Sequence, residues 1–291
     1  MGIGRINTNI AALRAYFNLT FSTEVLANHQ QRITTGLRVN MASDDPASFV
    51  MAKNMTIRVS NLATVQKSIN QARDMLHVVE GGLNAIVDTL REMKDKALEA
   101  ADGSIGTTER ISLGNAIKAL GASINDVAED TEFNNAKLLS GTYSTTGSGL
   151  LTFRTGVGVN DLTTVGFSTF GGLKREGDFT ISSLGLSSLV STGISTISEA
   201  SNIIAAVNNA ITYVNNAITE IGAKNKGLKA RTDALAIEQT NTESALTRIR
   251  DADTLFEAME TNKLQIRSQA TIAMLAQANV MPQMVLQLLG R

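Results

Sequence analysis

Closely spaced carboxylates are the residues of this sequence whose type and spacing could perform chemistry. Asp44 and Asp45 are adjacent, and Asp251 and Asp253 lie two positions apart. Such groups can ligate a metal ion or share acid–base work. No other carboxylate or histidine lies near Asp44 and Asp45 at ligand spacing, and residues two apart on a helix face different sides. We therefore expect loop contacts, helix caps or charge pairs between chains at these positions.

Other groups with catalytic potential are few. The 291 residues include no Cys and two His, His29 and His77, so a thiolate nucleophile and a histidine-rich metal site are both excluded. His77 follows the apolar Leu76, which favours a packing or surface role. The Gly156-Val157-Gly158 segment has no Lys-Ser or helix after it and is typical of a turn. We expect a protein that is not an enzyme and has no cofactor and no metal.

The overall composition restricts the partners. A net charge of −1 excludes nucleic acid as the main partner and suits a chain that associates with itself. Residues 1–20 lack the continuous apolar stretch of a secretory signal peptide. Residues 268–290 carry no charge, but Gln, Asn and Thr recur along them, so we expect a helix buried in protein and no membrane insertion.

Apolar residues that recur with a heptad period indicate the long helices of this chain. The first apolar seam comprises Leu62, Val65, Ile69, Ala72, Leu76, Val79, Leu83, Ile86, Leu90, Met93, Ala97 and Ala100. Twelve consecutive seam positions predict a coiled-coil helix of about 60 Å. We expect it to end at Asp102-Gly103 with Gly103 in a left-handed cap. A shorter seam from Leu113 to Val127 predicts a helix that folds back on the first.

The same period returns near the other end of the chain. This second seam comprises Ile197, Ala200, Ile204, Val207, Ile211, Val214, Ile218 and Ile221, and its register continues through Leu228, Leu235, Leu246, Ile249 and Phe256. Two long helices with apolar seams are expected to bury them against each other. The fold class predicted is mainly α, with long antiparallel coiled-coil helices, terminal helical arms and a small β-hairpin region.

The region between the seams differs in composition. Residues 140–200 are rich in Gly, Ser and Thr, and the runs 150–154 and 178–182 favour strands bounded by glycine turns. So few large apolar residues cannot form a separate core. We expect a β-rich loop region at 140–195 inside a coiled-coil domain of residues 43–254.

The two ends of the chain carry few charges. Residues 1–40 have five and residues 261–291 have three. Apolar residues recur at Ile6, Ile10, Leu13 and Phe17 in the first arm, and at Met259, Ile266, Ala273 and Val280 in the second. Helices with an apolar stripe and uncharged polar faces cannot bury themselves within one chain. We expect them to become ordered when neighbouring copies surround them, as an assembly element does.

Motifs along the chain match a known family. They are Ile6–Leu13, Arg32–Asn40, Ala42–Asp45, Phe133-Asn134 with Lys137–Leu139, Arg248–Asp253, Leu275–Asn279 and Pro282–Leu289. Because these motifs occur in the order in which the family has them, the chain resembles bacterial flagellin over about residues 1–140 and 195–291. The resemblance implies a subunit of the flagellar filament, an open helical homopolymer outside the cell, exported by the flagellar type III pathway without a cleaved signal peptide.

The resemblance also implies an architecture and partners. Arms 1–42 and 255–291 would pair in an inner core and residues 43–254 would form an outer tube. An export chaperone, cap proteins and junction proteins would be partners. The hook–filament junction protein, which has similar arms, is the alternative function. A self-contained coiled-coil binding module would have highly charged arms instead.

Residues expected to matter fall into two groups. The expected subunit interface comprises Ile6, Ile10, Leu13, Phe17, Arg32, Arg38, Asp44, Asp45, Arg248, Asp251, Asp253, Ile266, Leu275, Asn279, Pro282, Leu286 and Leu289, and the expected coiled-coil seam comprises Leu62, Ile69, Leu76, Leu83, Leu90, Ile204, Ile211 and Ile218. Many flagellins are recognised by an innate immune receptor at the segment 90–96. Here Glu92 inverts a charge of that pattern and Lys96 replaces an apolar residue, so we do not extend this recognition to the chain.

Overall fold

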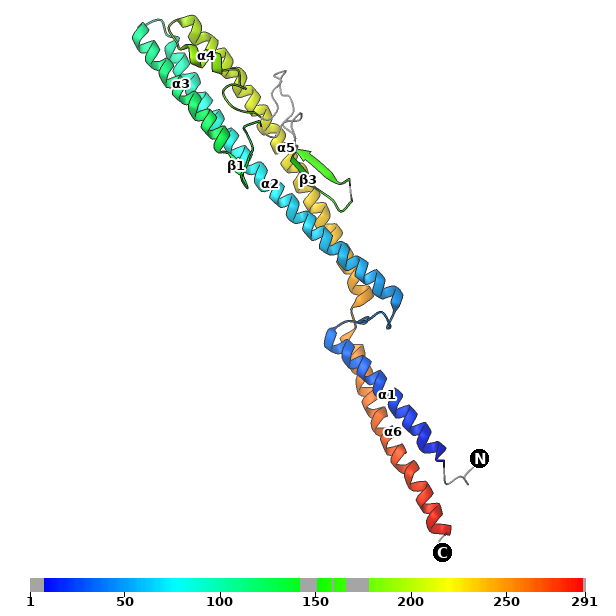
Figure 1. Ribbon diagram of the computed structural model, residues 1–291. Coiled ribbons are helices and arrows are strands. Elements are labelled where there is room, and N and C mark those ends of the chain that lie inside the picture. Colours follow the sequence, from blue (N-terminus) through cyan, green and yellow to red (C-terminus); the bar gives the residue numbers. More distant parts are fainter. Residues whose placement is uncertain (1–7, 142–150, 159, 166–177, 290–291) are drawn as a thin grey trace. The chain divides into compact units, whose positions relative to one another are not determined.

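The computed structural model describes residues 8–141, 151–158, 160–165 and 178–289. It contains two compact units, one made of residues 1–59 with 240–291 and the other of residues 60–239 (Figure 1). Long helices dominate both units, and the strands form two small antiparallel pairs. The predicted fold class is confirmed.

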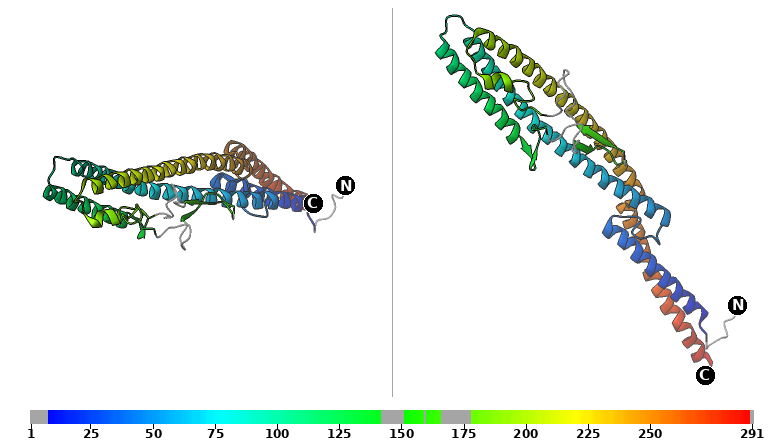
Figure 2. Two further views of the ribbon diagram at one scale, coloured as in Figure 1. Left: turned by 90° about the horizontal axis from the view of Figure 1, so that it is seen from above. Right: turned by 45° about the horizontal axis from the view of Figure 1, so that its top comes forward.

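The 60–239 unit is built around α2 (Pro46–Ala100). In Figures 1 and 2, α2 lies between α3 (Thr107–Asp130) and α5 (Ile197–Arg250). The seam residues Leu62, Ile69, Leu76, Leu83 and Leu90 are all fully buried in one continuous core. A strict heptad of large aliphatic residues therefore lies in the centre of this unit.

The partner seam on α5 is wider than the sequence pattern suggests. Its most deeply buried residues are Ala200, Ile203, Val207, Ala210, Val214, Ala217 and Ile221. Ile204, Ile211 and Ile218 are half-buried and pack along the edge of this core. The small Ala210 and Ala217 are almost fully buried in the same core.

The end of α2 differs from the expected glycine cap. Gly103 does not adopt the left-handed backbone conformation. Asp102 Oδ1 instead accepts the Ser104 N–H at 2.9 Å. The buried Arg110 of α3 donates to the carbonyls of Ala100 (2.8 Å), Asp102 (3.0 Å) and Ile105 (3.1 Å). One guanidinium with several donors thus satisfies the last carbonyl of α2 and two carbonyls of the connection to α3.

Two short hairpins accompany the helices. β1 (Glu132–Phe133) pairs with β2 (Ala136–Lys137), and β3 (Leu151–Arg154) pairs with β4 (Leu162–Val165). The strand predicted at 150–154 corresponds to β3 where the chain is described, and the 156–158 glycines lie in the β3–β4 connection.

The strand predicted at 178–182 is wrong. After one bridge between Ser140 and Asp178, the chain turns and leads to α4 (Ser187–Thr192). The Asp178 carboxylate accepts the Thr180 N–H at 2.9 Å, and Asn125 of α3 accepts the Ile181 N–H at 2.8 Å. Because side chains satisfy these backbone groups, no neighbouring strand is needed.

The other unit contains α1 (Ile10–Thr35) and α6 (Thr254–Leu289), which run antiparallel and side by side (Figures 1 and 2). Asn9 caps α1 by accepting the Ala12 N–H, and its amide donates to Ala278 O at 2.7 Å. Gly36, with φ of 70°, closes α1 in the left-handed conformation that glycine adopts without strain.

The register expected to continue through Phe256 is interrupted. α5 ends at Arg250, and α6 begins at Thr254. Asp253 Oδ1 accepts the N–H groups of Leu255 (3.0 Å) and Phe256 (3.2 Å), which is the contact of a helix N-cap. The apolar period crosses this break, but the helix does not.

Candidate assembly surface on the terminal helices

The contact between α1 and α6 is made by small and polar residues. The inner seam of α1 comprises Ala12, Ala15, Leu19, Ser22, Leu26, His29 and Ile33, and that of α6 comprises Glu257, Thr261, Leu264, Ser268, Thr271, Leu275 and Ala278, all buried or half-buried. Each set repeats at steps of three and four residues, as helices packed along their length require. Within one chain, the two helices therefore meet through a narrow face.

The large apolar side chains of the same helices face outward. We call these residues the outer faces: Ile10, Leu13, Tyr16, Phe17 and Phe21 on α1, and Leu255, Phe256, Met259, Ile266, Ile272, Met274 and Val280 on α6. Their exposed fractions range from 44% at Val280 to 77% at Leu255. With 3.6 residues per turn, Met259, Ile266 and Val280 point away from the inner seam of α6. Apolar patches of this extent mark interaction surfaces.

The predicted arm residues divide between these faces. Ile10, Leu13, Phe17 and Ile266 lie on the outer faces, whereas Leu275 is half-buried in the inner seam. Asn279 is exposed. Ile6 lies outside the described residues, and so do the side chains of Pro282, Leu286 and Leu289 at the end of α6.

Several outer-face residues were missed by the sequence analysis. Tyr16, Phe21, Leu255 and Met274 fall between the positions of the strict three-and-four pattern. Composition, and not period, could have indicated these residues. In a helix with few charges, large apolar side chains on several faces indicate that more than one face is covered by a partner.

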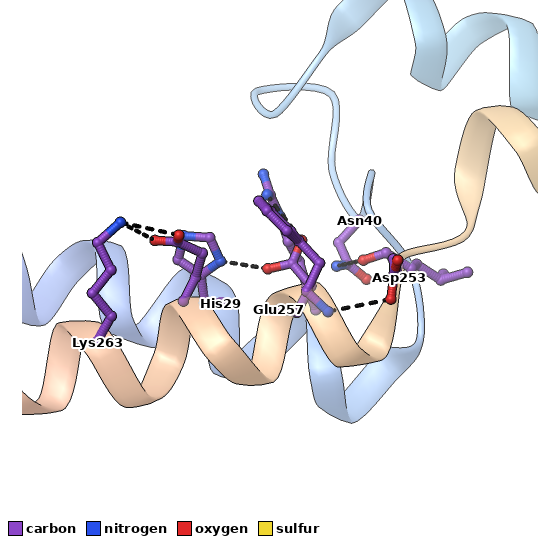
Figure 3. Close-up of polar contacts among 9 residues, drawn as sticks. His29, Asn40, Asp253, Glu257 and Lys263 are labelled. Atoms are coloured by element: carbon purple, nitrogen blue, oxygen red, sulfur yellow. Dashed lines mark hydrogen bonds and ion pairs between the residues drawn. The ribbon is translucent and has the colours of Figure 1, made fainter.

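A charged cluster joins the inner seam near the start of α6. Glu257 is 4% exposed, and its side-chain partners His29 and Arg32 lie on α1. His29 Nδ1 pairs with one carboxylate oxygen, and Arg32 Nη1 lies 3.5 Å from the other (Figure 3). The neighbouring Lys263–Glu260 pair, at 3.1 Å, stays on one helix. A buried carboxylate without partners is costly, so Glu257 favours the one register of α1 on α6 that supplies them.

The acidic residues of the loop that joins α1 to α2 accept hydrogen bonds from backbone N–H groups: Asp44 from within the loop, and Asp45 from the first turn of α2. Asp44 Oδ2 accepts the N–H groups of Asn40 (2.9 Å) and Met41 (3.0 Å). The hydrogen bond from Met41, followed by that from Asn40, lowers the pKa of Asp44. Asp45 Oδ1 accepts the Ser48 N–H at 3.1 Å, and hydrogen bonds from the Ser48 side chain and backbone lower the pKa of Asp45. α2 thus starts with an acidic cap followed by Pro46, which suits the first helical position.

Backbone contacts tie this loop to the segment between α5 and α6. Leu37 and Asp251 form an isolated antiparallel bridge, and the Ala252 N–H donates to Gly36 O at 2.9 Å. Arg38 donates from Nη2 to Ile249 O at 2.7 Å, and Arg248 is exposed. The predicted residues Arg38, Asp44, Asp45, Asp251 and Asp253 therefore shape the corners between helices.

In the other unit, Glu92 is exposed and Lys96 is half-buried and paired with Glu99 at 3.3 Å.

Over the described ranges, no group of three or more His, Asp or Glu residues is placed to hold a metal ion. No helix in the described part of the chain is long and apolar enough to cross a bilayer.

Comparison with known proteins gives a consistent result. Residues 6–144 match the family model of the bacterial flagellin N-terminal helical region, and residues 204–289 match that of the C-terminal helical region. The chain is 30% identical to the flagellin of Bacillus subtilis, over 98% of this chain and 99% of that protein. It is 28% identical to the flagellar filament core protein flaB2 of Brachyspira hyodysenteriae, over 98% and 99%.

A solved structure shares the fold. A Vibrio parahaemolyticus protein described as a flagellar hook-associated protein superposes with a TM-score of 0.58 at 19% identity, over 72% of this chain and 100% of that one.

Proposed function

Because the chain belongs to the bacterial flagellin family, we propose that it is a structural subunit of the flagellar filament that bacteria use for swimming. The observation that carries this proposal is the pair of outer faces on α1 and α6. A single chain leaves these faces exposed, whereas further copies of the same chain could cover them.

Burial of the outer faces supplies the driving force for assembly. Each large aliphatic or aromatic side chain that becomes fully buried contributes about 1.5–3 kcal/mol. Several such residues offset the ordering of the arms on incorporation. Contacts between different surfaces of identical copies generate an open helical fibre when the rotation from one copy to the next does not close into a ring. In this proposal the arms 1–42 and 255–291 form the inner core, and residues 43–254 form the outer tube.

We also propose that the chain acts outside the cell after export by the flagellar type III pathway. An export chaperone, a cap and junction proteins would be its other partners. The outer faces support a chaperone, because an exposed apolar surface on a free subunit invites unwanted association.

The hook–filament junction protein is the second candidate. The fold shared with the hook-associated protein of Vibrio parahaemolyticus favours it. Against it stand two relatives that match almost the full chain, one named as a flagellar filament core protein and the other as a flagellin.

Seeded growth tests the proposal. Purified chain is mixed with short filament seeds and imaged by electron microscopy, and we expect long uniform tubes. Ile266→Gln places an amide on the outer face of α6 and should stop growth. Ile111→Gln on α3 is the matched control, because Ile111 is exposed but lies outside the arms. Wild-type chain that stays monomeric with seeds would favour the junction protein instead.

A further inference from the structure

Two pairs of methionines in the described part of the chain differ sharply in exposure. Met75 (3% exposed) and Met93 (0%) belong to the core around α2. Met259 (64% exposed) and Met274 (58%) stand on the outer face of α6. Oxidants reach a thioether in proportion to its exposure, so the two pairs should differ sharply in reactivity.

We propose that Met259 and Met274 are oxidation sites at which peroxide arrests the assembly of the free subunit. In this step the thioether sulfur attacks one peroxide oxygen, an S–O bond forms and the O–O bond breaks. The sulfur loses two electrons and becomes a sulfoxide, and hydrogen peroxide is reduced to water. The inference rests on the filament function proposed above.

The chemistry of the outer face explains the arrest. Leu255 and Ile266 lie on the same side of α6 as Met259, and none of the three carries a polar group. A sulfoxide is a strong hydrogen-bond acceptor that needs a partner once water is removed. A neighbouring copy whose contact surface is equally apolar offers no such partner, so oxidised subunits are rejected at the growing end.

Incorporation should protect the same residues. When neighbouring copies cover the outer faces, peroxide no longer reaches the thioethers, so the sensitive state is the free subunit. Methionine sulfoxide reductase reverses the modification and should restore a subunit that has not yet been incorporated.

The test uses the full chain and hydrogen peroxide as the probe. Free chain is oxidised under conditions that preserve its circular dichroism spectrum, and peptide mass spectrometry measures sulfoxide at each methionine. We expect Met259 and Met274 to be modified before Met75 and Met93. Elongation of seeds should then fall at least tenfold and return after treatment with the reductase. Assembled filaments exposed to the same peroxide should retain unmodified Met259 and Met274.

Substitution identifies the residues responsible. Met259→Leu/Met274→Leu keeps an apolar side chain of similar volume and should make elongation resistant to peroxide. Met75→Leu/Met93→Leu is the buried control and should stay sensitive, and so should Met41→Leu/Met51→Leu, which changes two exposed methionines outside α6.

Two results would overturn the inference: wild-type chain carrying both sulfoxides that extends seeds at the untreated rate, or arrest that persists in Met259→Leu/Met274→Leu. Untreated wild-type chain that fails to extend seeds would contradict the filament function itself, which separates the two failures.

Discussion

Glu257 places a carboxylate in the inner seam of α1 and α6, and its partners His29 and Arg32 lie on the opposite helix. His29 lies 228 positions away in the sequence, so no local pattern reveals the pair. Composition and period predict that α6 has an apolar side. They cannot predict that its buried side carries a charge, because that depends on which residues α1 presents.

Removing one partner of this cluster should weaken the pairing of the arms. His29→Ala leaves Glu257 with Arg32 alone, and we expect the opening free energy of the adjacent α6 amides to fall by about 1–3 kcal/mol. Hydrogen exchange followed by mass spectrometry measures this change. Glu260→Ala removes an exposed pair on the same helix and should change exchange by less than about 0.5 kcal/mol. Equal exchange in His29→Ala and wild type would show that the pair does not hold the register.

Arg110 has a comparable role at the corner between α2 and α3, where it satisfies three backbone carbonyls. Arg110→Ala should lower the stability of the 60–239 unit by about 1–3 kcal/mol, because the buried carbonyl of Ala100 and the partly buried carbonyls of Asp102 and Ile105 lose their donor. Thermal unfolding followed by circular dichroism tests this. The exposed Arg91, which pairs with Asp88 on its own helix, is the control, and Arg91→Ala should leave the melting temperature nearly unchanged.

At the scale of the helices, predictability follows the size of the side chains. The α2 seam is a heptad of large aliphatic residues, and the structure buries those positions. The inner seam of the arms contains Ala12, Ala15, Ser22 and Thr261, residue types that are equally common on surfaces and in loops. Because such residues are only weakly hydrophobic, the periodicity that can be detected in the sequence is that of the large apolar residues on the outer faces.

Helix ends were harder to predict than helix faces. The apolar period runs through Ile249 and Phe256 across the break between α5 and α6, so period alone predicts one helix. The break depends on the Asp253 cap and on backbone bonds to Gly36, a residue more than two hundred positions earlier. Likewise, the turn at 178–182 depends on Asn125 of α3.

The loop between α1 and α2 should respond to acid. Asp44 has a pKa below its ordinary value in the folded chain, so it stabilises the loop above the unfolded pKa of about 4 and ceases to do so as the pH falls through the lower, folded value. Carboxyl chemical shifts measured by NMR against pH should give Asp44 a titration midpoint below the ordinary value of an aspartate in an unstructured peptide. Asp44→Asn should remove this titration. A midpoint for Asp44 at or above that ordinary value would contradict the two hydrogen bonds from Asn40 and Met41.

At the scale of the whole molecule, each compact unit has its own source of stability. Among the described residues, the core of the 60–239 unit is formed by residues between Leu62 and Leu235. The other unit combines residues from both ends of the chain and buries few large apolar side chains. Loss of an arm should therefore affect assembly far more than it affects the coiled coil.

Deletion of residues 280–291 tests this separation. The truncated chain loses the last turns of α6, and we expect it neither to elongate seeds nor to lose the thermal transition of the 60–239 unit. Sedimentation measures the polymer, and circular dichroism measures the transition. Normal filaments from the truncated chain would disprove a role for this segment in polymerisation.

The outer faces also give assembly a characteristic temperature dependence. Covering apolar surface lowers the heat capacity, and the favourable free energy of burial becomes smaller as water is cooled. A filament that grows by covering these faces is therefore expected to be cold-sensitive, with a critical concentration that rises between 25 °C and about 5 °C. Pelleting at each temperature measures it, and a critical concentration that falls on cooling would indicate polar contacts as the driving force. By this reasoning, the temperature of the surroundings helps to set how many subunits remain unpolymerised.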